Sequence, residues 1–227
     1  MHTSIFALSL VFMVSLAHGK PYGQHDMKRV LTAAPAPSAT GGKQNINTKH
    51  LDQVLDDLAV HARSYPPQFD TEPDKQRAIQ DIKTLSGILD GAIKDPHLAS
   101  QHLWRVGFLN SMGHNLDIPG SAEKAVAAFE KLLAASPSDP RGNYLYGAFL
   151  AGAGKSKQAL PYLRKAISAG LTYANYTAGI AHLSLGDKEN ALIHLEAYKR
   201  QHPKDEKVTK LIDSIRSGKV KIKGATN

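Results

Sequence analysis

Two stretches of the chain, residues 144–170 (YLYGAFLAGAGKSKQALPYLRKAISAG) and residues 176–202 (YTAGIAHLSLGDKENALIHLEAYKRQH), carry small and apolar residues at matching offsets. In each stretch one glycine lies twelve residues before an alanine and a second glycine lies five residues before it. These residues are Gly147, Gly154 and Ala159 in the first stretch and Gly179, Gly186 and Ala191 in the second. Such self-similarity is typical of stacked helical hairpins. The first glycine and the alanine allow two helices to approach closely, and the second glycine supplies the left-handed residue that ends the first helix.

A weaker copy of the pattern precedes these two. Ala125 lies 34 residues before Ala159, and Ala159 lies 32 residues before Ala191. Relative to a 34-residue period, the weaker copy carries an insertion of about six residues at 114–120. Its matching residues are Leu103, Val106, Gly107, Ala125, Phe129, Leu132 and Pro137.

The chain beyond residue 48 shows helical periodicity throughout. Apolar residues recur at steps of three and four, and no segment alternates with the period of a strand. Short connections rich in Pro, Gly and Asp separate the periodic segments. We therefore predict an all-α fold with nine helices, at 49–64, 72–94, 97–112, 121–136, 140–153, 156–169, 173–185, 188–201 and 204–217.

The repeated residues resemble those of the tetratricopeptide repeat family. The resemblance covers about residues 98–203 and departs from the family pattern at Leu171, where a closing Pro is usual, and at Tyr198, where a small residue is typical. It implies a right-handed solenoid of helical hairpins, with about three repeats within 97–203. Two extra helices at 49–96 precede these repeats, and an amphipathic helix at 204–217 is predicted to cap them.

The resemblance also implies a function in binding. Members of the family present a concave groove, lined by the first helix of each pair, to an extended peptide or a partner helix. Helical projection places five aromatic side chains toward that groove, namely Trp104, Phe108, Tyr144, Tyr173 and Tyr176. Packing between repeats is the alternative role for each of them. The positions that match a family clamp for acidic tails include Tyr144, Ala148, Tyr176 and Ile180, so we expect an apolar or aromatic peptide as the partner.

The N-terminal residues have the pattern of an export signal. A thirteen-residue apolar run at 5–17 is too short to span a bilayer, and Ala17-His18-Gly19 is a small-x-small cleavage site. We predict a signal peptide at 1–19, cleaved after Gly19 or Ala17, and hence a periplasmic or secreted protein. An uncleaved membrane anchor or a buried helix is the alternative. Residues 20–48 contain Pro and paired Gly without apolar periodicity and are predicted to be a flexible linker.

The formal net charge of +8 is unevenly distributed. Residues 51–100 are acidic, whereas residues 20–50 and the chain from 141 onward are basic. Because the basic residues are spread over several helices, we predict no nucleic-acid partner. The basic tail at 218–227 is suited to weak contact with an anionic membrane.

Catalytic and metal-binding motifs are absent from the sequence. It has no cysteine, no His-Glu-x-x-His pair, no phosphate-binding glycine loop and no Gly-x-Ser-x-Gly elbow. We therefore expect no enzymatic activity, no metal and no cofactor. Two alternatives stay open: a metal-binding protein or enzyme that uses His182 and His194, which can face each other across one hairpin, and a self-associating scaffold. An Asn175-Tyr176-Thr177 sequon lies in a predicted groove helix, where a glycan would obstruct binding.

Overall fold

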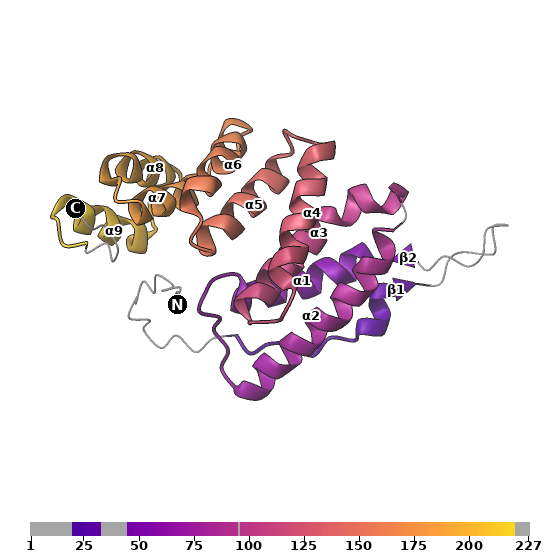
Figure 1. The fold of residues 1–227 in the computed structure, drawn as a ribbon. Helices are drawn as coiled ribbons and strands as arrows, with labels where there is room; N and C mark the ends of the chain where they lie inside the picture. The colour runs from indigo at the N-terminus through magenta and orange to yellow at the C-terminus, as the bar shows by residue number, and fades with distance from the viewer. Residues whose placement is uncertain (1–19, 33–44, 95, 221–227) are drawn as a thin grey trace, which may run out of the picture. The chain divides into compact units, whose positions relative to one another are not determined.

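The computed structural model describes three stretches of the chain, at residues 20–32, 45–94 and 96–220 (Figure 1). The described residues belong to two compact units, an N-terminal unit up to Ala135 and a C-terminal unit from Ser136. The predicted signal peptide at 1–19 lies outside the described residues. So do residues 33–44 of the predicted linker and the last seven residues of the predicted tail.

The described residues are all-α, as predicted, with nine α-helices, one short 3₁₀ helix and a two-residue strand pair. The N-terminal unit contains η1 (Met27–Val30), β1 (Leu31–Thr32), β2 (Asn45–Ile46), α1 (Thr48–Ala62), α2 (Glu72–Ala92), α3 (Pro96–Asn115) and α4 (Ser121–Ala135). The C-terminal unit contains α5 (Pro140–Gly152), α6 (Ser156–Ser168), α7 (Ala174–Ser184), α8 (Lys188–Gln201) and α9 (Glu206–Arg216). Within these described stretches, no helix is long and apolar enough to cross a membrane.

Side chains at the helix starts explain why the boundaries fall where they do. An oxygen atom of each of five side chains accepts a hydrogen bond from a backbone N–H in the first turn of the following helix. The five residues are Asn47, Thr71, Asp139, Asp187 and Asp205. Such N-caps satisfy donors that have no partner within the helix, and each contributes about 1 kcal/mol.

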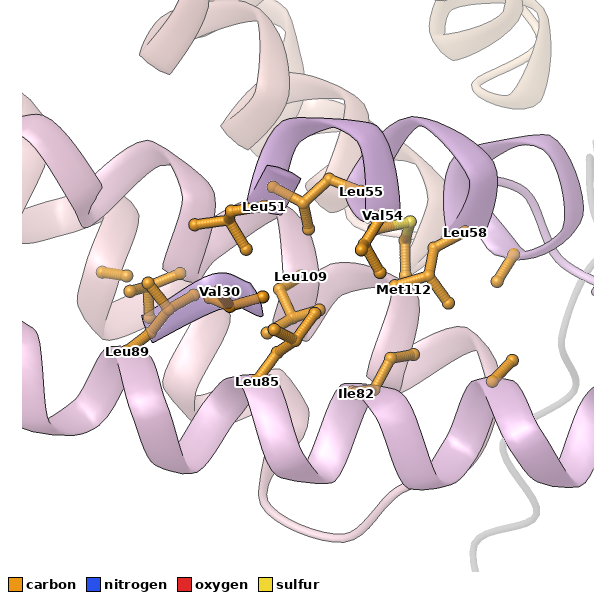
Figure 2. Close-up of a cluster of buried hydrophobic side chains, with 14 of the residues drawn as sticks. Val30, Leu51, Val54, Leu55, Leu58, Ile82, Leu85, Leu89, Leu109 and Met112 are labelled. Carbon is orange, nitrogen blue, oxygen red and sulfur yellow. The ribbon is translucent and has the colours of Figure 1, made fainter. Parts of the chain in front are cut away.

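The core of the N-terminal unit lies around α3, which packs against α1, α2 and α4. Its side chains are apolar and almost fully buried, for example Leu55 of α1, Leu85 of α2 and Leu109 of α3. Figure 2 shows that Val30 of η1 enters the same layer, beside Leu89. Residues that precede the first α-helix therefore form part of the core.

The prediction of a flexible linker over 20–48 is wrong for residues 20–32 and 45–47. Tyr22 is 2% exposed and Val30 is 0% exposed. The Tyr22 hydroxyl donates to Asp81 Oδ2 of α2 at 2.7 Å, and Leu31 pairs with Ile46 in the strand ladder. Burial of each large side chain contributes about 1.5–3 kcal/mol, and these anchors offset the ordering cost of a segment that lacks apolar periodicity. We call residues 20–32 the N-terminal strap.

The C-terminal unit is built from helices that pack in chain order, α5 with α6, α6 with α7, α7 with α8 and α8 with α9 (Figure 1). A Cβ atom added to Gly147 of α5 would lie 2.8 Å from Leu163 Cγ of α6. A Cβ atom added to Gly179 of α7 would lie 2.7 Å from Leu195 Cγ of α8. The leucine four residues after the repeated alanine therefore fills the space at each glycine, which shows why the sequence needs glycine there.

The N-terminal unit contains the same contact with a longer connection. A Cβ atom at Gly107 of α3 would collide with the ring of Phe129 of α4. From 107 to 129 the separation is six residues longer than from 147 to 163, which matches the predicted insertion. Part of the insertion lengthens α3, which ends at Asn115 rather than at 112.

The turn glycines have the predicted conformation. Gly154 and Gly186 follow α5 and α7 with φ of 76° and 82°. The N–H of each donates to the carbonyl three residues before it, and the next N–H donates five residues back, at Lys155 to Leu150 and at Asp187 to His182. This pair of hydrogen bonds is the Schellman motif, which satisfies carbonyl groups at the end of a helix.

Candidate functional site

Three of the predicted groove residues lie together in the C-terminal unit. Tyr144 of α5 meets Tyr173, which directly precedes α7, with ring centroids 4.7 Å apart and ring planes at 90°. Tyr176 of α7 lies 5.4 Å from Tyr198 of α8 between ring centroids. Tyr173 and Tyr176 are 41% and 39% exposed, whereas Tyr144 is 8% exposed. We call these four residues the tyrosine surface, and its exposed part is formed mainly by Tyr173 and Tyr176.

The start of α9 holds one edge of this surface. Tyr198 donates a hydrogen bond to Asp205 Oδ2 at 3.4 Å, and the N-capping Oδ1 of Asp205 accepts from Lys207 N at 3.0 Å. His202 stacks on the Tyr198 ring, with ring centroids 4.3 Å apart. The position of the Tyr198 ring therefore depends on the helix that follows the last predicted repeat.

The pKa values of two of these phenols are raised above the ordinary tyrosine value. Burial raises the pKa of Tyr176, and the nearby Asp205 carboxylate adds to the shift. Burial, followed by the charge of Asp205 and the hydrogen bond to it, raises the pKa of Tyr198. A neutral phenol gives a flat apolar ring and a polar tip, which suits contact with a peptide side chain together with a hydrogen bond to its backbone.

The two other predicted groove residues belong to the N-terminal unit. Trp104 and Phe108 of α3 are half-buried and pack against the core of that unit. The Arg105 guanidinium lies 4.3 Å from the centroid of the Trp104 ring and makes two hydrogen bonds of 2.7 Å to the Asp52 carboxylate. This clamp, which the sequence did not suggest, fixes one face of the indole.

A repeated asparagine was also missed. Asn143 and Asn175 occupy equivalent places, 32 residues apart, and both side chains are buried. Each donates to a carbonyl shortly before it, Asn143 to Asp139 and Asn175 to Thr172. The 32-residue period contains the signal that would have found this pair. Because the Asn175 side chain is buried and its amide donates to Thr172 O, the folded chain does not present the acceptor asparagine of the sequon to solvent.

The two histidines of the last hairpin face each other, as the sequence predicted. The rings of His182 and His194 stack with centroids 5.3 Å apart and planes 15° apart. Nearly parallel rings direct their in-plane lone pairs into separate planes, so the pair does not converge on one metal ion at the usual distance of about 2.1 Å. Among the residues that the structure describes, no group of three His, Asp or Glu side chains is arranged to hold a metal.

Comparisons of the chain with protein-family models, with curated proteins and with solved structures gave no match.

Proposed function

We propose that this chain is a non-catalytic protein–protein interaction module, an exported adaptor or assembly factor that binds a peptide segment of a partner protein. In this proposal residues 97–203 are tetratricopeptide repeats that form a right-handed solenoid, with α9 as its cap. The partner is an extended segment with apolar or aromatic side chains that docks in the concave groove.

The recurring glycine contact carries the repeat part of the proposal. The pairs Gly147 with Leu163 and Gly179 with Leu195 have the same sequence separation and the same close approach. Similar repeats pack in the same way, so they produce the same contact at a fixed interval along the sequence. The contact of Gly107 with Phe129 extends the pattern to α3 and α4.

The tyrosine surface supports the binding part. Tyrosine is favoured at interfaces because its ring buries a large area while only two side-chain torsions are ordered. Tyr173 and Tyr176 lie three residues apart and are exposed together, while Tyr144 and Tyr198 support them from neighbouring helices. Trp104 and Phe108 pack against the core of the N-terminal unit, so the proposal does not depend on their being free.

Export is proposed from the signal-like residues 1–19. Cleavage after Gly19 or Ala17 would leave the whole N-terminal strap in the mature chain, including the anchor Tyr22. The strap then serves as the folded start of the exported protein, in the periplasm or outside the cell.

The binding proposal is tested with a displayed library of random peptides, selected against the purified protein. We expect enrichment of peptides with apolar and aromatic residues, and at least about a tenfold loss of their affinity in Tyr173→Ala/Tyr176→Ala, since each lost aromatic contact contributes about 1–2 kcal/mol. Tyr65→Ala is the matched control, because Tyr65 is 55% exposed in the N-terminal unit. Equal binding by the double variant, or selection of no peptide by the wild type, would contradict the proposal.

A further inference from the structure

A small pocket lies between α6, α7 and α8, and none of its lining residues belongs to the tyrosine surface. Its lining residues are mostly polar: Leu160, Arg164, Ala178, His182, Asn190 and His194. Three of them, Arg164, His182 and His194, are capable of carrying positive charge. No carboxylate lines the pocket, although Asp187 lies beside His182.

The hydrogen-bond network fixes the proton positions of both histidines. Asp187 Oδ2 accepts from His182 Nδ1 at 3.0 Å, because a carboxylate cannot donate. Asn175 uses its amide N–H to reach Thr172 O at 2.9 Å, so its Oδ1 accepts from His194 Nδ1 at 2.8 Å. Both Nδ1 atoms therefore carry the proton, and the Nε2 atoms, which have no hydrogen-bond partner among the described residues, bear the lone pairs of the neutral rings.

The groups around the pocket that can carry positive charge outnumber the carboxylates near it. Burial, then the neighbouring His182 and Arg164, lower the pKa of His194, while Asp187 opposes the shift. Asp187 is itself held by its N-cap and side-chain hydrogen bonds with Asn190. Within the part of the chain that the structure describes, Arg164 has no ion-pair partner. An anion placed here would meet an unpaired guanidinium and would favour protonation of His194.

We propose that this pocket binds a carboxylate, to which Arg164 donates a forked pair of hydrogen bonds, and that binding is accompanied by proton uptake at His194 Nε2. The planar guanidinium fork matches a carboxylate in geometry. A protonated Nε2 adds a donor, whereas the neutral ring presents a lone pair that repels the anion. Carboxylate binding is therefore tighter at a pH where His194 can take up a proton.

Nuclear magnetic resonance of the histidine Cε1–H groups in the full chain tests this directly, with acetate as the probe and sodium chloride at matched ionic strength as the reference. At about pH 6 we expect a saturable shift of the His182 and His194 resonances with acetate alone. At about pH 8 the affinity falls by at least about tenfold, because the proton that accompanies binding must be taken from a more alkaline solution.

Arg164→Gln is the diagnostic variant and Lys165→Gln the control, since both side chains are exposed on α6 and only Arg164 lines the pocket. We expect Arg164→Gln to weaken acetate binding by about tenfold or more, as is usual for a lost charge-assisted hydrogen bond, and Lys165→Gln to leave it unchanged. A second probe tests whether the pocket also binds an acidic side chain of a polypeptide, as distinct from a free acid. For this, binding of acetyl-Gly-Glu-Gly-amide is compared with binding of acetyl-Gly-Gln-Gly-amide.

Absence of a saturable shift in the wild type, equal affinity in Arg164→Gln, or equal affinity at the two pH values would each overturn the proposal. Because the pocket shares no lining residue with the tyrosine surface, that outcome is separable from failure of the proposed peptide binding.

Discussion

Replacing Gly147 by alanine tests the packing that defines the predicted repeat. The added Cβ would lie 2.8 Å from Leu163 Cγ, 2.9 Å from its Cδ2 and 3.2 Å from its backbone N. Optimal carbon contacts are about 3.5–4.0 Å, and Leu163 is 0% exposed, so it has no room to move aside. Overpacking of this kind costs about 1–3 kcal/mol, against which alanine gains about 1 kcal/mol in helix propensity. We expect a net loss of about 0–2 kcal/mol.

Gly152→Ala supplies the matched control in the same helix, because a Cβ at Gly152 meets nothing within 4 Å. Gly152→Ala should gain helix propensity without any overpacking. Its free energy of unfolding, measured in urea by circular dichroism, should therefore be about 1–3 kcal/mol higher than that of Gly147→Ala. Equal stability of the two variants would refute the close packing of α5 on α6.

A double-mutant cycle makes the test specific to the contact. Leu163→Ala alone should cost about 2–5 kcal/mol, and in that background Gly147→Ala should no longer destabilise, giving a coupling of about 1–3 kcal/mol. The cycle of Gly179 with Leu195 should give a coupling of similar size. Additive effects in both pairs would show that the glycines are not needed for close approach.

Three further predictions concern the N-terminal unit. Tyr22→Phe removes the hydrogen bond to Asp81 and should lower the free energy of unfolding by about 1–3 kcal/mol in urea, whereas an unchanged value would mean that the strap does not anchor the unit. Burial alone would raise the pKa of Asp57, but hydrogen bonds from the Gly23 N–H, His25 and Lys20 lower it overall. The contribution of Asp57 to stability is therefore complete above about pH 5 and is lost as the pH falls through its folded pKa. When the free energy of unfolding in urea is measured over a series of pH values, Asp57→Asn should show a smaller loss of stability at acid pH than the wild type. Burial, then Arg105, lowers the pKa of His102, so nuclear magnetic resonance should find it neutral at about pH 6.5, and stability should decline as the pH falls below that value. A His102 that is already charged at that pH would contradict the burial argument.

The parts of the fold that the sequence predicted depend on local patterns. Periodicity located the helices, and the fixed offset from Gly147 to Ala159 located the hairpins, since both are repeated along the chain. The left-handed turns at Gly154 and Gly186 were predictable because glycine is favoured there for a steric reason.

The N-terminal strap could not be found in this way. Its anchors have distant partners, with Tyr22 bonded to Asp81 and Gly23 bonded to Asp57, and no local period marks them. The prediction of a flexible linker used the composition of residues 20–48 as a whole, and this composition gave no sign that Tyr22 and Val30 are buried.

The candidate site was predicted in part for a related reason. A helical projection shows which side chains share a face, but neighbouring helices decide how far each side chain is covered. Tyr176 stays exposed, whereas Tyr144, at the equivalent position, is buried behind Tyr173. Arg164 and its pocket depend on three helices at once, so no single amphipathic pattern indicates them.

The most direct test of the proposed function is photocrosslinking from position 176 in the full chain, expressed in cells. Tyr176 is replaced by p-benzoylphenylalanine, the same residue is placed at Tyr65 as the control, and the crosslinked peptides are identified by mass spectrometry. We predict that position 176 captures a defined segment of a partner protein, rich in apolar or aromatic residues, and that position 65 does not. The same crosslinks from both positions, or none from position 176, would contradict the account.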